Sequence, residues 1–131
     1  MSATLPWCFE DEETPGSIAL PDQLADATGF VPALWHVELA NALLQAEQRA
    51  RIDQASIARF IGLLESLSIE TDYELDRRLL APLLALARRH RLTAYGAVYL
   101  ELAMRRGQPL ATRDKPLRRA ARSVGVSLSD A

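Results

Sequence analysis

The chain has 131 residues, of which 49% are hydrophobic and 24% are charged, and this composition is typical of a single globular domain covering residues 1–131. The single cysteine, Cys8, excludes a disulfide framework and cannot form a zinc site alone, which favours a reducing compartment. No apolar run reaches the roughly 18 residues that a membrane span requires, and the N-terminus lacks the basic and apolar regions of a signal peptide. We therefore expect a cytoplasmic protein with no membrane partner.

Charge is distributed unevenly along the chain, although the formal net charge is only −2. Residues 1–76 hold 14 acidic and 3 basic residues, whereas residues 77–131 hold 3 acidic and 12 basic residues. Nearly all of the basic residues are arginines, whose planar guanidinium groups suit phosphate contacts, so the C-terminal half is a candidate nucleic-acid surface. The alternative is that some of these arginines only complete the last turns of helices, and the sequence leaves it open for Arg88, Arg89, Arg105 and Arg106.

Helical and extended segments alternate along the chain, which predicts an α/β fold with a parallel sheet flanked by helices. Asp53 and Thr93 are good N-caps, and Gly107 can take the left-handed conformation that ends a helix. Pro82 is expected to kink its helix, in which Leu80 and Leu84 point inward. In chain order, we expect helices over about 15–27, 33–49, 54–67, 76–90, 94–106 and 116–124, and strands over 29–32, 69–71, 109–112 and 126–128.

The predicted helix at 33–49 carries a narrow polar stripe on a surface that is otherwise apolar almost all round, so we expect it to be largely buried. Glu38 and Asn41 lie on this stripe, one turn apart. Because an unpaired carboxylate is costly to bury, Glu38 is a candidate site residue. The alternative is a solvated stripe that closes a surface helix, and periodicity taken alone favours that alternative.

A second candidate site follows the predicted strand at 109–112. Asp114 lies just after this strand, and ligands of parallel α/β sheets bind beyond the carboxyl ends of strands. Thr112 lies two residues earlier, where its hydroxyl can orient a ligand or bind a phosphate. Both residues have a structural alternative, because either can cap the helix that follows.

Three stretches carry a resemblance to a known family: ELANAL at residues 38–43, TAYGAVYLELAMRRG at 93–107 and PLATRDKPLRRAA at 109–121. Together they resemble the PIN-domain ribonucleases, specifically the VapC-type toxins of VapBC toxin–antitoxin pairs. The resemblance implies a PIN-like three-layer sandwich and a metal-dependent endoribonuclease that hydrolyses RNA phosphodiesters. It also implies Mg²⁺ or Mn²⁺ as the cofactor, and RNA, a cognate antitoxin and a second copy of the chain in a homodimer as partners.

The family binds its metal ions through four acids, and the resemblance transfers two of them, Glu38 and Asp114, as catalytic and metal-binding residues. Gly96 stands where the family has an aspartate, in the third position after Thr93. We expect Glu38 and Asp114 to converge in one cleft that Gly96 also lines. The resemblance further implies supporting roles for Ser2 and Asn41, and Thr112 is a third supporting residue because of its place two positions ahead of Asp114. The basic charge of the C-terminal half predicts RNA-binding roles for Arg113, Arg118, Arg119 and Arg122.

Two carboxylates can hold one Mg²⁺ loosely but not a pair of ions. An alternative function is therefore a PIN-fold protein that no longer cleaves and only binds its antitoxin or RNA. An unrelated helical adaptor is a third possibility, which the density of the matching motifs disfavours.

The fourth family acid ends a first strand that is central in the family's sheet. The segment from Ser2 to Trp7 matches the family from its serine onward, which places that strand and its aspartate before Met1. Without it, a slot between the strands at 29–32 and 109–112 leaves backbone groups unpaired, which is costly. We therefore expect a translation start several codons upstream; the alternative is a truncated relic that a partner keeps in solution.

Overall fold

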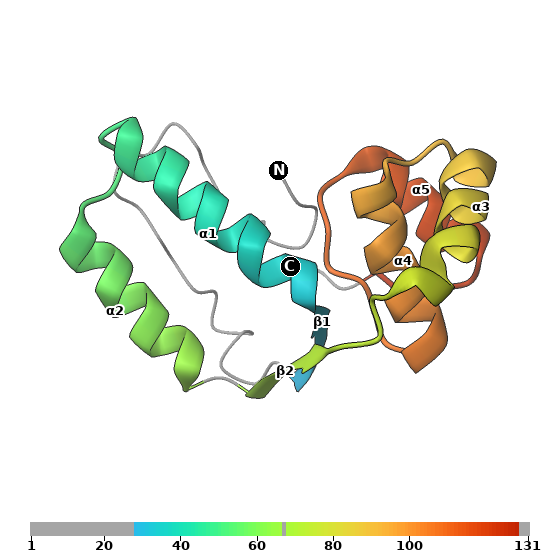
Figure 1. The fold of residues 1–131 in the computed structure, drawn as a ribbon, viewed down its shortest axis with the longest axis horizontal. Helices are drawn as coiled ribbons and strands as arrows, with labels where there is room; N and C mark the ends of the chain where they lie inside the picture. Colours follow the sequence, from blue (N-terminus) through green and yellow to red (C-terminus); the bar gives the residue numbers. More distant parts are fainter. Residues whose placement is uncertain (1–27, 67, 129–131) are drawn as a thin grey trace.

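A short parallel sheet lies at the base of the molecule, with α1 and α2 to one side and the other helices to the opposite side (Figure 1). The structure is a computed structural model that describes residues 28–66 and 68–128. Strand β1 (Thr28–Pro32) pairs in parallel with β2 (Ser68–Asp72). Helices α1 (Ala33–Gln48) and α2 (Gln54–Glu65) form the connection, because parallel strands need a long crossover.

The remaining helices pack against one another on the far side of the sheet (Figure 1). They are α3 (Leu80–His90), α4 (Ala94–Arg106) and α5 (Lys115–Ser123), and a 3₁₀ turn at Arg77–Leu79 precedes α3. The predicted helix starts are confirmed, since the side chain of Asp53 accepts the N–H of Ser56 at 2.8 Å and that of Thr93 accepts the N–H of Gly96 at 3.0 Å. Gly107 ends α4 with φ at 62°, as the sequence predicted.

One apolar core takes its buried side chains from four of the five α-helices found in the described residues, and Leu86 of the fifth, α3, packs against it. Apolar side chains at helical spacing on α1 and α4 belong to one buried cluster that also contains residues of α2 and α5. The side chains of Leu100 and Leu117 have no exposed surface. The cluster comprises Trp35, Leu39, Leu43, Phe60, Tyr99, Leu100, Ala103, Leu110, Leu117, Ala120 and Ala121. The cluster connects α1 with α4, and the candidate site lies between these two helices.

Two predictions about helix burial are wrong in part. Helix α1 is amphipathic rather than buried all round, since Val37 is 67% exposed and Leu44 is 51% exposed. Leu80 and Leu84 do not point inward, because α3 packs on α4 through one face only and leaves them 62% and 42% exposed. The helix expected from residue 76 is a 3₁₀ turn followed by α3, so that Pro82 lies in the first turn of α3, where a missing N–H costs nothing.

Up to residue 128, where the described part of the chain ends, the two strands predicted near the C-terminus form one parallel bridge, between Leu110 and Leu128. The N–H of Leu110 donates to the carbonyl of Ser127 at 2.9 Å. Pro109 has no N–H to extend the pairing, and Gly125, with φ at 78°, turns the chain just before the second segment. The two apolar runs therefore lie side by side without forming full strands in the described residues.

A side chain takes the place of a neighbouring strand at one edge of β1. The N–H of Phe30 donates to Oε1 of Gln108 at 3.0 Å, and Nε2 of Gln108 donates to the carbonyl of Phe30 at 2.9 Å. Within residues 28–66 and 68–128, β1 pairs with β2 alone. The expected central strand is not among the described residues, and its presence stays a prediction.

Candidate metal and RNA site

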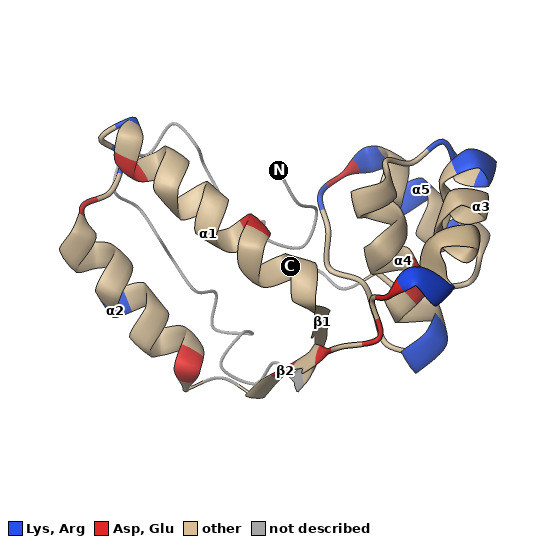
Figure 2. Ribbon diagram, viewed as in Figure 1, with Lys and Arg blue, Asp and Glu red and all other residues tan. Residues whose placement is uncertain are grey.

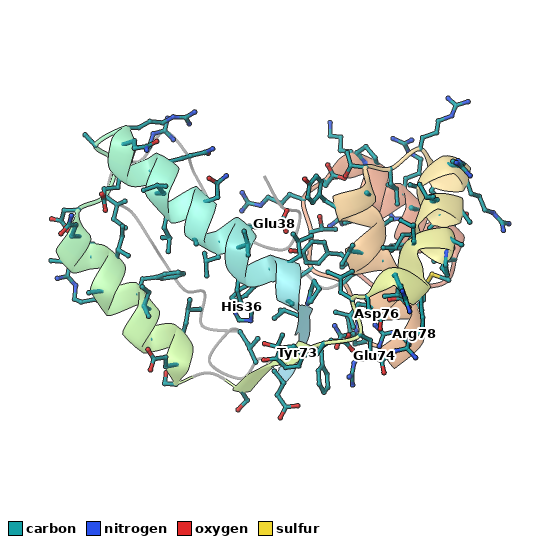
Figure 3. All side chains as sticks on the ribbon, in the orientation of Figure 1. His36, Glu38, Tyr73, Glu74, Asp76 and Arg78 are labelled. Carbon is teal, nitrogen blue, oxygen red and sulfur yellow. The ribbon has the colours of Figure 1, made fainter. Side chains whose placement is uncertain are left out.

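Glu38 lies on the side of α1 that faces α4, whereas His36 points toward β2 (Figure 3). The Glu38 carboxylate is partly buried, and its Oε1 accepts a hydrogen bond from the hydroxyl of Tyr99 on α4. Asn41, one turn further along α1, is exposed. The polar stripe of α1 therefore has two parts: Asn41 meets solvent, and Glu38 is paired across a helix interface, where the pairing offsets its desolvation.

Gly96 lies on α4 one turn before Tyr99, so both residues belong to the same face of the helix. Its φ is not positive, and its N–H donates to the Thr93 cap. A Cβ added at Gly96 would lie 3.5 Å from Oγ1 of Thr93 and 3.7 Å from Cβ of Leu92, which is ordinary van der Waals contact. Neither the backbone nor the contacts of an added Cβ require glycine at this position.

Asp114 is exposed and caps α5, since its Oδ2 accepts the N–H of Leu117 at 3.0 Å. Thr112 is only 2% exposed, and its Oγ1 accepts the N–H of Asp114 at 3.0 Å. Asp114 therefore has the structural role that the sequence offered as an alternative, namely the N-cap of α5. Thr112 does not cap the helix; it stabilises the turn that precedes Asp114. A carboxylate has a second oxygen, so capping by Oδ2 does not prevent Asp114 from binding a metal ion.

The structure brings Glu38 to α4 within one turn of Gly96, and α5, which Asp114 caps, packs on α4. The convergence of Glu38 and Asp114 in one cleft stays a prediction, and Ser2 lies outside the described residues. Within residues 28–66 and 68–128, no three His, Cys, Asp or Glu side chains cluster closely enough to hold a metal ion. The carboxylates present suit one hydrated Mg²⁺ or Mn²⁺, which keeps several waters, and do not suit a pair of ions.

A comparison with protein families matches the PIN domain over residues 6–123. The chain belongs to the PIN domain family. Most PIN domains are metal-dependent nucleases, and they typically bind Mg²⁺ or Mn²⁺. The predicted α/β fold, with a short parallel sheet flanked by helices, is confirmed. Searches of curated proteins and of solved structures found no match. In the described part of this PIN domain, no helix combines the length and apolar character needed to cross a membrane.

Basic residues of the PIN domain gather on the half formed by α3, α4 and α5 (Figure 2). Arg118 is partly buried and donates from Nη1 to the carbonyl of Thr112 at 2.8 Å, so it supports the turn that carries Asp114. Arg119 and Arg122 are exposed on α5, three residues apart and on one face, and Arg113 is exposed in the loop before α5. Arg119 and Arg122 are therefore an exposed pair on one face of α5, whereas Arg118 is engaged by the turn before the helix.

Sequence reasoning missed an ionic cluster around Asp72, at the end of β2. Asp72 is 3% exposed and accepts hydrogen bonds from Arg105 at 2.8 Å and from Arg106 at 2.6 Å. The bonds from Arg105, together with those from Arg106 and the backbone N–H of Glu74, hold the pKa of Asp72 far below its usual range, although burial opposes this. The guanidinium of Arg106 also lies 3.4 Å from the ring centroid of Phe30 on β1.

This cluster corrects the interpretation of Arg105 and Arg106. Both side chains do more than complete the last turn of α4, and their guanidinium groups are already bound. Arg105 and Arg106 pair with Asp72 on β2, and Arg106 also lies over the ring of Phe30 on β1, so together they connect the end of α4 to both strands. An acid at the end of a strand and an arginine pair at the end of a helix were the only signals in the sequence. More than 30 positions separate the partners, and local patterns do not connect them.

Proposed function

We propose that this PIN domain is the toxin of a VapBC-type toxin–antitoxin pair and a metal-dependent endoribonuclease that hydrolyses RNA phosphodiesters. The observation that carries the nuclease activity is the partly buried carboxylate of Glu38, paired across the α1–α4 interface one turn from position 96. The toxin assignment rests on the motifs around Gly96 and Asp114, and it includes a cognate antitoxin and a homodimer as partners.

In this proposal, Glu38 and Asp114 hold one Mg²⁺ or Mn²⁺. When bound, the ion supplies an activated water and charge neutralisation at the phosphate. Thr112 keeps Asp114 at the start of α5 through its bond to the backbone N–H. Arg119 and Arg122 contact the RNA backbone, which positions the substrate without reading its sequence.

Replacing Glu38 with glutamine tests the proposed activity. The wild-type chain is expected to cleave RNA slowly in Mn²⁺, because glycine at position 96 supplies no ligand. Glu38→Gln is expected to lower the cleavage rate by about 10-fold or more, since the amide removes a charged ligand of the ion. The matched control is Glu47→Gln, which changes another carboxylate of α1 and is expected to cleave at the wild-type rate. Cleavage that persists in a chelator, or that Glu38→Gln leaves intact, would refute the proposal.

A second candidate function is binding of antitoxin or RNA without cleavage. It is favoured by glycine at position 96 and by the lack of a three-ligand cluster within the described ranges. Calorimetric titration with Mn²⁺ separates the two functions. Saturable binding supports the nuclease, whereas RNA or antitoxin binding that is the same with Mn²⁺ and with a chelator supports the binding protein.

The arginines of α5 give a prediction about salt. If Arg119 and Arg122 both contact phosphates of single-stranded RNA, replacing both with alanine is expected to reduce the slope of log Kd against log salt concentration by about 1.4. The control is Arg78→Ala, because Arg78 is already paired with Asp76 at 2.9 Å. The slope is measured by titrating labelled RNA at several salt concentrations. A slope near zero for the wild type would mean that these arginines serve the helix rather than RNA.

A further inference from the structure

We propose that Tyr99 is a positioning residue that holds the carboxylate of Glu38 in place for metal binding. The inference rests on the proposed function, because it assigns a role within the same site. It adds a residue that makes no contact with the ion and acts through Glu38 alone.

Core packing holds the ring of Tyr99 in place independently of its hydrogen bond to Glu38. Tyr99 is 3% exposed and belongs to the core cluster that joins α1 and α4. The same cluster contains Trp35 and Leu39, which flank Glu38 on α1 at three residues before and one residue after. Because both backbones and the ring are held by core packing, the hydroxyl of Tyr99 occupies a defined place beside Glu38.

The fixed hydroxyl of Tyr99 orders the Glu38 carboxylate before a metal ion binds. A glutamate side chain has several rotatable bonds, and ordering it costs conformational entropy that a metal ion alone would have to offset. The hydroxyl of Tyr99 donates to Oε1, which leaves Oε2 as the oxygen available to an ion. Partners of this kind orient metal ligands, and removing them typically weakens metal binding by about 10- to 100-fold.

The position of Tyr99 on α4 also sets the direction of Glu38. Tyr99 lies one turn after Gly96 on the same face of α4, so the hydrogen bond draws Glu38 to the face that carries position 96. Tyr95 lies one residue before Gly96 and is 60% exposed. The helix therefore supplies two tyrosines of which only one is buried and paired with Glu38.

The test is the Mn²⁺ dissociation constant of Tyr99→Phe, measured by calorimetry. This change keeps the ring and its packing and removes only the hydroxyl, and we expect the Kd to rise by about 10-fold. Tyr95→Phe is the matched control, with an expected Kd equal to that of the wild type. A Tyr99→Phe variant that binds Mn²⁺ as tightly as the wild type would overturn the inference and leave the proposed nuclease function standing. A wild-type chain that binds no Mn²⁺ would overturn both.

A double-mutant cycle with Glu38→Asp distinguishes the proposed positioning role of Tyr99 from a merely structural role. That change keeps a carboxylate but shortens the side chain by one methylene, which withdraws it from the hydroxyl. If Tyr99 acts through Glu38, Tyr99→Phe causes no further rise in Kd in the Glu38→Asp background. The same rise in both backgrounds would show that the hydroxyl acts through the fold and not through Glu38, and the inference would be wrong.

Discussion

Replacing Asp72 with asparagine is expected to lower the free energy of unfolding by about 3 kcal/mol. The carboxylate is 3% exposed and accepts hydrogen bonds from Arg105 and Arg106 on both of its oxygens. Asparagine removes the negative charge of the acceptor and replaces one acceptor oxygen with an NH₂ group, so the bonds that remain are weaker. The two arginine side chains are 28% and 32% exposed, so they regain some hydration, which keeps the loss below that of a fully buried pair. Urea unfolding of the two proteins measures the difference.

Asp76→Asn is the matched control for Asp72→Asn. Asp76 also forms an ion pair, but its side chain is 44% exposed and that of its partner, Arg78, is 81% exposed. Solvent screens such a pair, so we expect little change in stability. Equal losses for the two variants would mean that the cluster around Asp72 contributes no more than a surface ion pair.

The Asp72 cluster also predicts how stability depends on pH. Hydrogen bonds from Arg105, and then from Arg106, hold the pKa of Asp72 in the folded state below its ordinary value of 3.8. Its stabilising contribution is therefore complete above that ordinary value and is lost as the pH falls toward the folded-state pKa. We expect the free energy of unfolding to fall more steeply below pH 3.8 in the wild type than in Asp72→Asn. Parallel curves over this window would contradict the assignment.

Gly96→Asp is expected to tighten Mn²⁺ binding by about 10-fold or more, because it adds a carboxylate one turn from the residue that holds Glu38. The Cβ of the new side chain causes no clash, since the nearest atoms lie at 3.5 Å and 3.7 Å. The change is also expected to stabilise the fold by up to about 1 kcal/mol, because glycine disfavours a helix and an acid is favoured in the first turn. Thermal unfolding and calorimetry measure the two effects separately.

The matched control is Gly62→Asp, since Gly62 lies in α2, is exposed and has no atom within 4 Å of an added Cβ. It makes the same change in net charge and the same replacement of a helical glycine, at a position on a different helix. We expect no change in Mn²⁺ affinity for this variant.

Sequence predicted the features of this fold whose causes are local. The N-caps Asp53, Thr93 and Asp114 bond to N–H groups three residues away, and Gly107 ends its own helix, so each signal lies within one turn. The strand expected at 109–112 failed for the opposite reason. Its apolar run was recognisable, but a ladder depends on a partner strand elsewhere in the chain.

The contacts that organise the site connect distant positions. Tyr99 and Glu38 are 61 positions apart, and Gln108 and Phe30 are 78 apart. Glu38 and Asp114 were nominated because they match family motifs, whereas Tyr99 occupies an apolar position of α4, where an aromatic side chain is read as core. It is indeed core, and only the fold shows that its hydroxyl meets a carboxylate.

The central claim is that Glu38 and position 96 line one metal site, and the most direct test is a Mn²⁺ titration of Gly96→Asp with and without Glu38→Gln. If the two positions share an ion, the gain in affinity from Gly96→Asp is lost or strongly reduced when Glu38 is replaced. A gain that survives Glu38→Gln unchanged, or that Gly62→Asp reproduces, would contradict the claim.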